Sequence, residues 1–266
     1  MDATGNADLA LLIEAAREAG AIAQGFFRRD PKVWWKEGNS PVSEADFAVD
    51  RFLRDTLRKA RPDYGWLSEE SEAAESAAAG EAPRRFFVVD PIDGTRAFLR
   101  GEDTWCVSIA VIEGVRPVAG ILEVPALAER FTASAGHPAH LGEAVLDLNE
   151  RPDRPLRLAL PDSVRRSLGA EALADIAVVP TVPSLAYRLA LVAAGRIDGT
   201  LIRPRANDWD IAAGDLILEQ AGGRLVDAEG RARLYKIEGK RHGLLIAGAP
   251  HALGRLGAFA ATLGGA

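Results

Sequence analysis

The sequence predicts an α+β fold in the first half of the chain and an α/β fold in the second half. In the first half, two helical patterns precede a run of short apolar segments, which is typical of an antiparallel sheet covered by helices. In the second half, short apolar segments alternate with helical ones. The pattern changes in a polar, proline-rich stretch at 148–155. We therefore expect an N-terminal α+β subdomain at 1–148 and a C-terminal α/β subdomain at 149–266.

Two helices are expected before the first strand. Apolar side chains recur at intervals of three and four, which predicts an amphipathic helix over 7–29. A second helix is expected to begin after Ser43 and to end before Pro62, with its apolar residues facing inward. Residues 71–85 are small or charged and carry few large apolar groups, so we expect a loop or a frayed helix whose composition permits mobility. The sequence does not indicate whether this segment closes over a site.

The remaining elements follow from short apolar runs and their boundaries. Aromatic and β-branched residues favour buried strands, and the gap EGVR between two such runs predicts a hairpin. Helices expected at 184–195 and 211–223 each end at glycine, a common residue at helix C-termini. The strands are expected at 86–90, 105–112, 117–124 and 129–134 in the first half and at 156–160, 176–180, 199–203 and 243–249 in the second, with a last helix after the final strand.

Composition and charge exclude several classes of protein. The chain of 266 residues has 32 basic and 38 acidic side chains, for a net charge of −6, whereas nucleic-acid-binding proteins normally carry a cationic surface. A single cysteine, Cys106, excludes an internal disulfide and a cysteine-based zinc site, and its apolar context favours packing. No apolar run reaches the roughly 20 residues of a membrane span, and the N-terminus lacks the basic start of a signal peptide. We therefore expect a soluble, cytoplasmic protein.

The segment D-P-I-D-G-T at 90–95 carries the strongest chemical signal. It directly follows an expected buried strand, and Pro91 and Gly94 favour a sharp turn. That turn aims two carboxylates at one point, where they repel each other unless a cation neutralises them, and hard ions such as Mg²⁺ prefer oxygen ligands. A helix that follows Gly94 would also offer free N–H groups to a phosphate. A turn with an aspartate N-cap before a helix explains the same residues without any ligand.

Three further segments with acidic residues have a structural and a functional interpretation. Glu69 and Glu70 follow the apolar segment GWL, and such adjacent acids are most often a solvated edge. Asp210 opens an expected helix, where aspartate is most often an N-cap. Ser43 and Asp46 have the spacing of a capping box. Taken one by one, these residues are explained by local structure alone.

Taken together and in order, these segments resemble the motifs of the inositol monophosphatase superfamily. The segments that carry the resemblance are GNSPVSEAD at 38–46, WLSEES at 66–71, VVDPIDGTRAF at 88–98 and WDIAAGDLILEQAGG at 209–223, and their order and spacing fit from about residue 7 to 250. The resemblance implies a layered α-β-α-β-α sandwich with a site between two subdomains. It also implies a lithium-sensitive, Mg²⁺-dependent phosphomonoesterase that is commonly a homodimer.

The same resemblance assigns the ligands of about two to three Mg²⁺ ions to matched positions. The implied ligands are Glu69, Asp90 and the carbonyl of Ile92 at one site, and Asp90, Asp93 and Asp210 at another. Most of these ligands belong to the N-terminal subdomain, and the C-terminal subdomain supplies Asp210. Lys36 and Glu70 are candidate supporting residues beside these ligands.

The resemblance also assigns the residues that handle water and phosphate. Asp46 and Thr95 would orient and deprotonate the attacking water, because a hydroxyl is a poor base without a carboxylate partner. Glu69 is assigned to catalysis as well as to metal binding. The backbone N–H groups of Gly94 and Thr95 would hold the phosphate, next to Asp93. The implied mechanism is direct attack by water, without a phosphoenzyme.

The expected substrate follows from the segment LIRPRANDWD at 201–210. Family members that act on inositol phosphates tend to carry an acid shortly before the W-D pair, whereas this chain carries Arg203 and Arg205. Arginine favours a second phosphate through bidentate hydrogen bonds. The resemblance therefore points to the 3′(2′),5′-bisphosphate nucleotidase branch, with 3′-phosphoadenosine 5′-phosphate as substrate. Ser184 matches a position that often borders the substrate, although Pro183 replaces the glycine that is frequent before it.

Alternatives to this substrate stay open. Arg203 and Arg205 are equally explained as solvent-exposed side chains. Inositol 1-phosphate is the first alternative substrate, followed by histidinol phosphate or a sugar bisphosphate. A different class is a non-catalytic regulator that binds RNA or a protein partner, but the intact acidic set and the net charge of −6 argue against it.

Overall fold

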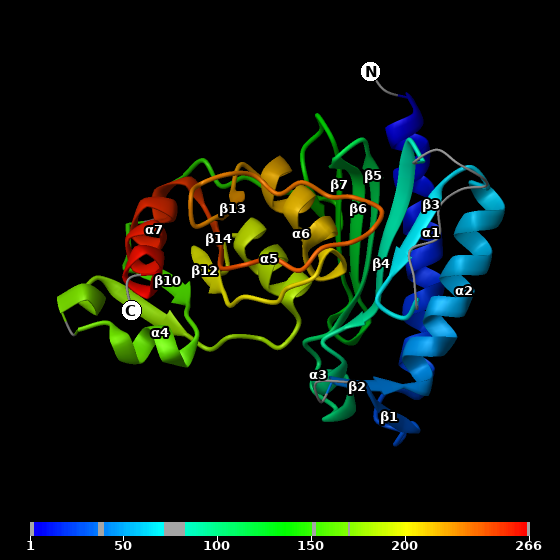
Figure 1. Ribbon diagram of the computed structural model, residues 1–266, viewed down its shortest axis with the longest axis horizontal. Coiled ribbons are helices and arrows are strands. Elements are labelled where there is room, and N and C mark those ends of the chain that lie inside the picture. Colours follow the sequence, from blue (N-terminus) through cyan, green and yellow to red (C-terminus); the bar gives the residue numbers. More distant parts are fainter. Residues whose placement is uncertain (1–2, 37–39, 72–82, 151–152, 170, 265–266) are drawn as a thin grey trace.

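Five layers make up the fold, in the order helices, sheet, helices, sheet, helices (Figure 1). The computed structural model describes residues 3–36, 40–71, 83–150, 153–169 and 171–264. Two long helices cover a seven-stranded sheet, two helices from the second half fill the central layer, and a five-stranded sheet with its own covering helices follows. This arrangement is the layered α-β-α-β-α sandwich that the sequence motifs imply.

The first outer layer and the large sheet come from the first half of the chain. α1 (Ala3–Phe26) and α2 (Glu44–Ala60) bury an apolar face against the strands. All neighbouring strands of this sheet are antiparallel except the parallel pair β3 and β4. In spatial order its strands are β3 (Gly65–Ser68), β4 (Arg85–Asp93), β5 (Cys106–Glu113), β6 (Arg116–Val124), β7 (Glu129–Ser134), β8 (His140–Leu141) and β9 (Ala144–Val145).

The central and last layers come from the second half of the chain. α5 (Leu185–Ala193) and α6 (Asp208–Gln220) pack against the other face of the large sheet. α7 (Pro250–Gly264) and the short α4 (Asp162–Ser167) pack on the far side of the five-stranded sheet. In spatial order the strands of this mixed sheet are β11 (Ile176–Val179), β10 (Leu156–Ala159), β12 (Gly199–Ile202), β14 (Leu245–Gly248) and β13 (Arg224–Asp227).

Small elements gather at one end of the large sheet. β1 (Val33–Lys36) and β2 (Ser40–Ser43) form an antiparallel hairpin that leads directly into α2. α3 (Thr95–Leu99) follows β4 and lies beside this hairpin (Figure 1). Two short 3₁₀ helices elsewhere are η1 (Pro125–Leu127) and η2 (Glu171–Leu173). The C-terminal end of β4 and the N-terminal ends of α2 and α3 therefore meet in one place.

Three hydrophobic clusters join the layers. One lies between the outer helices and the large sheet and includes Trp66 and Trp105, both fully buried. The largest joins the large sheet to α5 and α6, so residues of both halves share one core. The third lies between the five-stranded sheet and α7. Because the layers are packed in this way, the starts of α5 and α6 are held against the end of β4.

Most predicted elements are confirmed, and the differences concern boundaries. The strand expected to end at Asp90 continues to Asp93, because β5 pairs with it on both sides of an irregularity between these two residues. The helix expected from residue 211 begins at Asp208. The β1–β2 hairpin, β3, β8, β9 and β13 were not predicted, although β1, β2, β3 and β13 are as long as the four-residue strands of the second half that were predicted.

The structure does not test the loop predicted at 71–85 or the predicted division into two subdomains. The loop expected at 71–85 falls largely on residues 72–82, which lie outside the described residues. The division into subdomains at 148–155 stays a prediction. Within the described ranges, the helices are too short or too polar to cross a membrane.

Candidate active site

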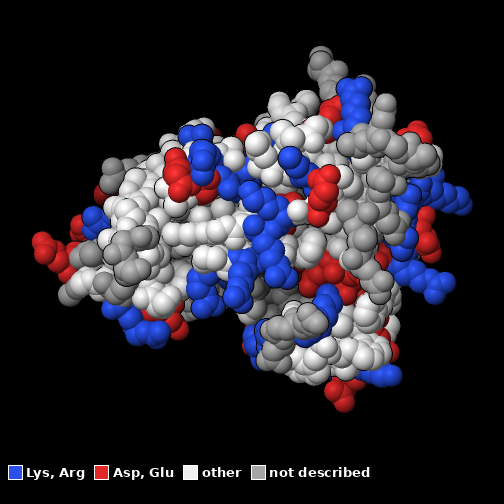
Figure 2. Space-filling view, in the orientation of Figure 1, with Lys and Arg blue, Asp and Glu red and all other residues white. Residues whose placement is uncertain are grey.

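Three carboxylates converge where β4 ends. Asp90 and Asp93 are the last acidic residues of β4 and are buried, and Asp210 lies in the first turn of α6. One oxygen atom from each side chain lies within 4.8 Å of the other two. Figure 2 shows acidic side chains in a hollow of this face, between β4, α6 and the β1–β2 hairpin. The residues that the sequence motifs single out thus form one cluster.

The backbone after β4 is shaped by the D-P-I-D-G-T segment. Oδ1 of Asp90 accepts a hydrogen bond of 3.1 Å from the N–H of Ile92, which fixes the first carboxylate against its own strand. Gly94 adopts a φ of +93°, in the left-handed region that favours glycine. A Cβ there would lie 3.1 Å from the Cβ of Ser184. Gly94 therefore allows both the turn into α3 and the close approach of α5.

Two of the acidic side chains are capping-box residues of their helices. Asp46 is residue N3 of α2, and its Oδ2 accepts the N–H of Ser43 at 2.8 Å. Asp210 is residue N3 of α6, and its Oδ2 accepts the N–H of Asn207 at 2.6 Å. The predicted Ser43–Asp46 capping box is confirmed, whereas the reading of Asp210 as an N-cap is wrong because Asn207 holds that position. Each box occupies one carboxylate oxygen and orients the other.

Thr95 lies between Asp46 and the end of β4. Its Oγ1 is 3.2 Å from Oδ1 of Asp46 and 3.0 Å from the carbonyl oxygen of Ile92. A hydroxyl has one proton, so it donates to one of these oxygens at a time and keeps lone pairs for another partner. The predicted pair of a hydroxyl and a carboxylate is therefore in contact, at the edge of the acidic cluster.

Glu69, Glu70 and Lys36 form an ion-paired group beside the cluster. The N–H of Glu69 donates to the carbonyl of Val89 at 3.1 Å, which places Glu69 next to Asp90. Nζ of Lys36 lies 3.3 Å from Oε1 of Glu69 and 2.6 Å from Oε1 of Glu70. Lys36 thus brings a positive charge from the hairpin to the two glutamates.

Burial and mutual repulsion favour protonation of these carboxylates. Burial, followed by the charges of Glu69, Asp93 and Asp210, raises the pKa of Asp90 well above its ordinary value. Burial and then the charge of Asp93 raise the pKa of Asp210 well above its ordinary value. Burial raises the pKa of Asp93 to about 6, although Ser184 and backbone N–H groups oppose the shift. Buried acids that repel one another are stabilised by a cation, so the donor set suits a divalent metal.

The pKa of the neighbouring acids rises for the same reason. Burial is the largest cause for Asp46, whose pKa rises to about 6, and hydrogen bonds from Ser43 oppose it. Burial also raises the pKa of Glu70 to about 7, opposed by the hydrogen bond from Lys36. A carboxylate that holds a proton near neutral pH can exchange it with a hydroxyl or with water.

α5 closes the site from the second half of the chain. Ser184 is the N-cap of α5 and donates to Oδ2 of Asp93 at 2.5 Å, and the N–H of Ala186 donates to the same oxygen at 2.6 Å. Pro183, in the place of the usual glycine, leaves this contact intact. Cys106 is fully buried, 3.5 Å from Oγ of Ser184, and burial raises the pKa of its thiol well above the ordinary value. Cys106 is therefore a packing residue, as its sequence context predicts.

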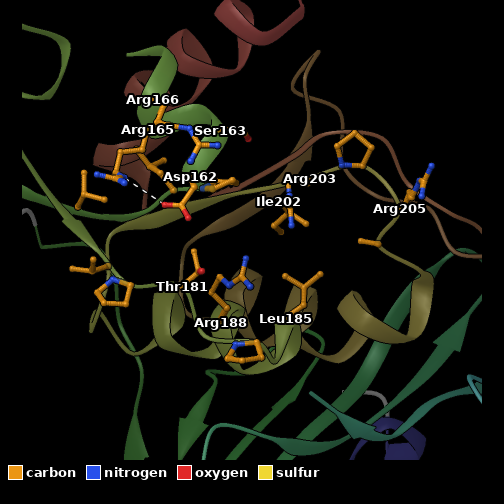
Figure 3. A pocket seen from close by; sticks show the side chains of 18 residues that line it. Asp162, Ser163, Arg165, Arg166, Thr181, Leu185, Arg188, Ile202, Arg203 and Arg205 are labelled. Carbon is orange, nitrogen blue, oxygen red and sulfur yellow. Dashed lines mark ion pairs between the residues drawn. The ribbon is translucent and has the colours of Figure 1, made fainter. Parts of the chain in front are cut away.

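Arg203 and Arg205 line a cavity beside the acidic cluster. The cavity measures about 860 Å³ and lies between α4, α5 and the loop that follows β12. Both arginines are exposed, and Arg203 points into the cavity whereas Arg205 lies at its rim (Figure 3). Arg188 of α5 points into the same cavity and was missed by sequence reasoning. Its spacing of four residues from Ser184, one helical turn, is the signal that could have found it.

The layered fold and the carboxylate cluster are typical of enzymes that use divalent metal ions, because the donor set suits such an ion. Comparison with known proteins identifies its family: residues 7–257 match the Inositol monophosphatase family, so the chain belongs to it. Proteins of this family are phosphomonoester hydrolases that in general depend on Mg²⁺, and the chain is accordingly a phosphoric monoester hydrolase.

Curated relatives carry several different names. The Nus factor SuhB of Pasteurella multocida is 34% identical over 236 residues, which cover 85% of this chain and 86% of the relative. The inositol-1-monophosphatase of Mesorhizobium japonicum is 34% identical over 233 residues, with coverage of 84% and 86%. The 3′(2′),5′-bisphosphate nucleotidase CysQ of Aggregatibacter actinomycetemcomitans is 27% identical over 231 residues, with coverage of 81% and 82%.

A solved structure extends the likeness over nearly the whole fold. The extragenic suppressor protein suhB from Bartonella henselae superposes with a TM-score of 0.81 at 30% sequence identity. The superposition covers 96% of this chain and 98% of the other. The two proteins therefore share their fold over nearly their whole lengths.

Proposed function

We propose that the chain hydrolyses a small phosphorylated metabolite by direct attack of water at phosphorus. The observation that carries this proposal is the convergence of Asp90, Asp93 and Asp210, with a hydroxyl–carboxylate pair at their edge. The proposed ligands of two to three Mg²⁺ ions are Glu69, Asp90, the carbonyl of Ile92, Asp93 and Asp210. When bound, the ions lower the pKa of water and neutralise charge on the phosphate.

The residues of the chain hold the reactants and move one proton. The Thr95 hydroxyl passes its proton to Asp46 and accepts the proton of the attacking water, so the water oxygen becomes the nucleophile. The N–H groups of Gly94 and Thr95 face the phosphate. The new P–O bond forms as the ester P–O bond breaks, the alcohol leaves with a proton from solvent, and inorganic phosphate remains.

The substrate proposed first is 3′-phosphoadenosine 5′-phosphate, which would give AMP and phosphate. Arg203 supports this choice, because a guanidinium at the cavity wall suits a second phosphate. Inositol 1-phosphate is the second candidate, favoured by the higher identity to the relative named inositol-1-monophosphatase, 34% against 27%. Histidinol phosphate and sugar bisphosphates rank below these two.

Inhibition by lithium, dimerisation and location in the cell are expected from the family rather than from particular contacts. We propose that Li⁺ inhibits the enzyme by displacing one Mg²⁺, that the protein is a homodimer, and that it acts in the cytoplasm. The relative named Nus factor SuhB suggests the alternative of a regulator that binds RNA or protein. The complete carboxylate cluster favours the enzyme, since a regulator has no need of it.

A substrate panel with Mg²⁺ tests the proposal. We expect faster turnover of 3′-phosphoadenosine 5′-phosphate than of inositol 1-phosphate, and a loss of several orders of magnitude in kcat for D93N on every substrate. D55N is a matched control, because Asp55 is exposed on α2. A higher kcat/KM for inositol 1-phosphate would reverse the order of the two substrates, and undiminished activity of D93N would remove the catalytic basis.

A further inference from the structure

The arginine-lined cavity has an unbalanced positive charge. Of the described residues that line it, five are arginines and one, Asp162, is acidic. Oδ1 of Asp162 lies 3.5 Å from Nε of Arg165 on the same short helix, α4. The other four arginines form no ion pair with any carboxylate in the described part of the chain. The lining residues that the argument uses are Arg165, Arg166, Arg188, Arg203 and Arg205.

Arg188 and Arg203 approach the cavity from opposite walls (Figure 3). Arg188 lies on α5, where one Nη donates to the carbonyl of Val182 at 2.6 Å. Its buried Nε has no hydrogen-bond partner among the residues that the structure describes. Burial lowers the pKa of Arg188, the charge of Asp93 raises it, and the charge of Arg203 lowers it. Two guanidinium groups on opposite walls of one cavity are suited to a bound anion between them.

The cavity is connected to the acidic cluster through one segment of the chain. Ser184 contacts Asp93, while its neighbours Pro183 and Leu185 line the cavity, and Arg188 follows one turn later on the same helix. A molecule whose phosphate lies at the cluster therefore extends past the start of α5 into the cavity. The volume of about 860 Å³ lies within the usual range for ligand sites, and it leaves room for much more than a phosphate.

The walls between the arginines are apolar. Val178, Val179, Leu185 and Ile202 line the cavity together with the arginines. Apolar walls with a few charged donors suit a ligand that has a nonpolar or ring-shaped part and an anionic group. Guanidinium groups also hold phosphate through paired N–H donors and stack on aromatic rings.

We propose that this cavity binds the distal part of a doubly phosphorylated substrate, with its second phosphate between Arg188 and Arg203. Arg188 is the residue that sets the preference for two phosphates over one. Arg165 and Arg166 on α4 extend the positive field at the outer wall. This inference rests on the proposed phosphatase function, which it deepens by assigning a site to the second phosphate.

Kinetics of R188M test the assignment. We expect kcat/KM for 3′-phosphoadenosine 5′-phosphate to fall on the order of 10- to 100-fold relative to kcat/KM for inositol 1-phosphate, mostly through KM, because a charge-assisted pair is lost. R188K restores part of the preference, since lysine keeps the charge but not the paired donors. R203M shows the same change in preference, and R51M, at an exposed arginine of α2, leaves the preference unchanged. An unchanged preference in R188M and R203M would overturn the assignment.

Kinetics with a second bisphosphate decide between two kinds of doubly phosphorylated substrate. Fructose 1,6-bisphosphate has two phosphates but no base, whereas the nucleoside bisphosphate has a base that can lie on the apolar wall. We expect the nucleoside bisphosphate to be preferred, and R188M to weaken both. If R188M affects neither, the cavity does not hold the second phosphate.

Binding without turnover separates this inference from the proposed function. AMP carries only the phosphate that would lie in the cavity, and without Mg²⁺ the acidic cluster repels it. We expect calorimetry to show AMP binding to the wild-type protein, weaker adenosine binding, and a loss of AMP binding in R188M and, less strongly, in R166M. Arg166 is exposed on α4, so its replacement does not endanger folding. If the protein hydrolyses phosphate esters but does not bind AMP, the cavity assignment alone is overturned. If the protein binds AMP through Arg188 but has no phosphatase activity, the proposed function alone is overturned.

Discussion

Ser184 donates a hydrogen bond of 2.5 Å to Oδ2 of Asp93, across 91 positions of sequence. The N–H of Ala186 donates to the same oxygen, so the start of α5 holds one side of this carboxylate. Asp93 also belongs to the cluster formed with Asp90 and Asp210. The second half of the chain thus orients a proposed metal ligand that belongs to the first half.

Replacement of Ser184 by alanine should weaken Mg²⁺ binding. Groups that orient a metal ligand typically contribute 10- to 100-fold to metal affinity, so we expect a rise of that order in the Mg²⁺ concentration needed for half-maximal activity. The N–H of Tyr187 also loses its cap, at a cost of about 1 kcal/mol in the free energy of unfolding. Activity as a function of Mg²⁺ and urea denaturation measure the two effects. S134A, which removes a buried hydroxyl of β7, should leave the Mg²⁺ dependence unchanged; an equal change in both variants would contradict the role of Ser184.

Removal of the Thr95 hydroxyl should slow the chemical step. T95V keeps the size of the side chain but cannot relay a proton to Asp46, which lies 3.2 Å away. General acid–base groups contribute about 10²- to 10⁴-fold, so we expect kcat to fall by that factor while KM changes little. T95S should recover most of kcat, since it restores the hydroxyl. A T95V enzyme with wild-type kcat would show that water is activated without this pair; T262V, on α7, is the control.

The acidic residues show how much of the site is readable from sequence. Asp46 was explained both by a capping box and by a proposed catalytic role, and the geometry is compatible with both: the box holds one oxygen and leaves the other beside Thr95. Asp210 has the same arrangement in α6. Local spacing predicted the start of α2 but not that of α6, which begins at Asp208 instead of residue 211. Only the ordered set of motifs indicated that these distant residues meet.

The cavity could not be predicted in the same way. Arg188 lies on a helix whose sequence is otherwise apolar, and its direction depends on how α5 packs below α4 and β12. Arg203 and Arg205 were predicted together, yet Arg205 has a φ of +94° and lies at the rim. Adjacent charges in a loop give no sign of which one faces inward. Such directions are set by tertiary packing, which a sequence pattern does not contain.

Stability should depend on pH and Mg²⁺ together. The pKa of Asp46 and of Asp93 is raised to about 6, and that of Glu70 to about 7, from ordinary values of 3.8 and 4.5. As pH rises from about 4 to about 7, the unfolded chain loses these protons before the folded, metal-free chain does, so the stability of the metal-free protein falls. Mg²⁺ binding to Asp93 must release its proton, and the positive charge of the ion also favours loss of the protons of Asp46 and Glu70 nearby. We therefore expect Mg²⁺ to raise Tm little at pH 5 and strongly at pH 8.

Thermal denaturation with and without Mg²⁺ at several pH values checks this coupling. NaCl at matched ionic strength is the control for screening, and it should give no pH-dependent rise in Tm. D93N should lose most of the Mg²⁺-dependent rise at pH 8. An equal Mg²⁺ effect at pH 5 and pH 8 would contradict the coupling between these carboxyl groups and the metal.

The packing of α5 against α6 should be sensitive to a single methyl group. α5 carries Ser184 at its start and α6 carries Asp210, and the two helices meet where a Cβ on Gly214 would lie 2.8 Å from the Cβ of Leu189. Overpacking of this kind costs about 1–3 kcal/mol, so G214A should lower the free energy of unfolding by that amount. We expect it also to lower activity, because it moves α5, which carries Ser184 at its start, relative to α6, which carries Asp210.

Gly254 provides the matched control for this last change. It lies within α7, and a Cβ there would meet no atom within 4 Å. G254A should therefore raise the free energy of unfolding by about 0.5–1 kcal/mol, since alanine favours a helix interior more than glycine does, and it should leave activity unchanged. Urea denaturation compares the free energies of unfolding of G214A and G254A. Assays with saturating Mg²⁺ compare the activities of the same two variants. If G214A were as stable and as active as G254A, the closeness of α5 and α6 would not be what holds the two halves of the site together.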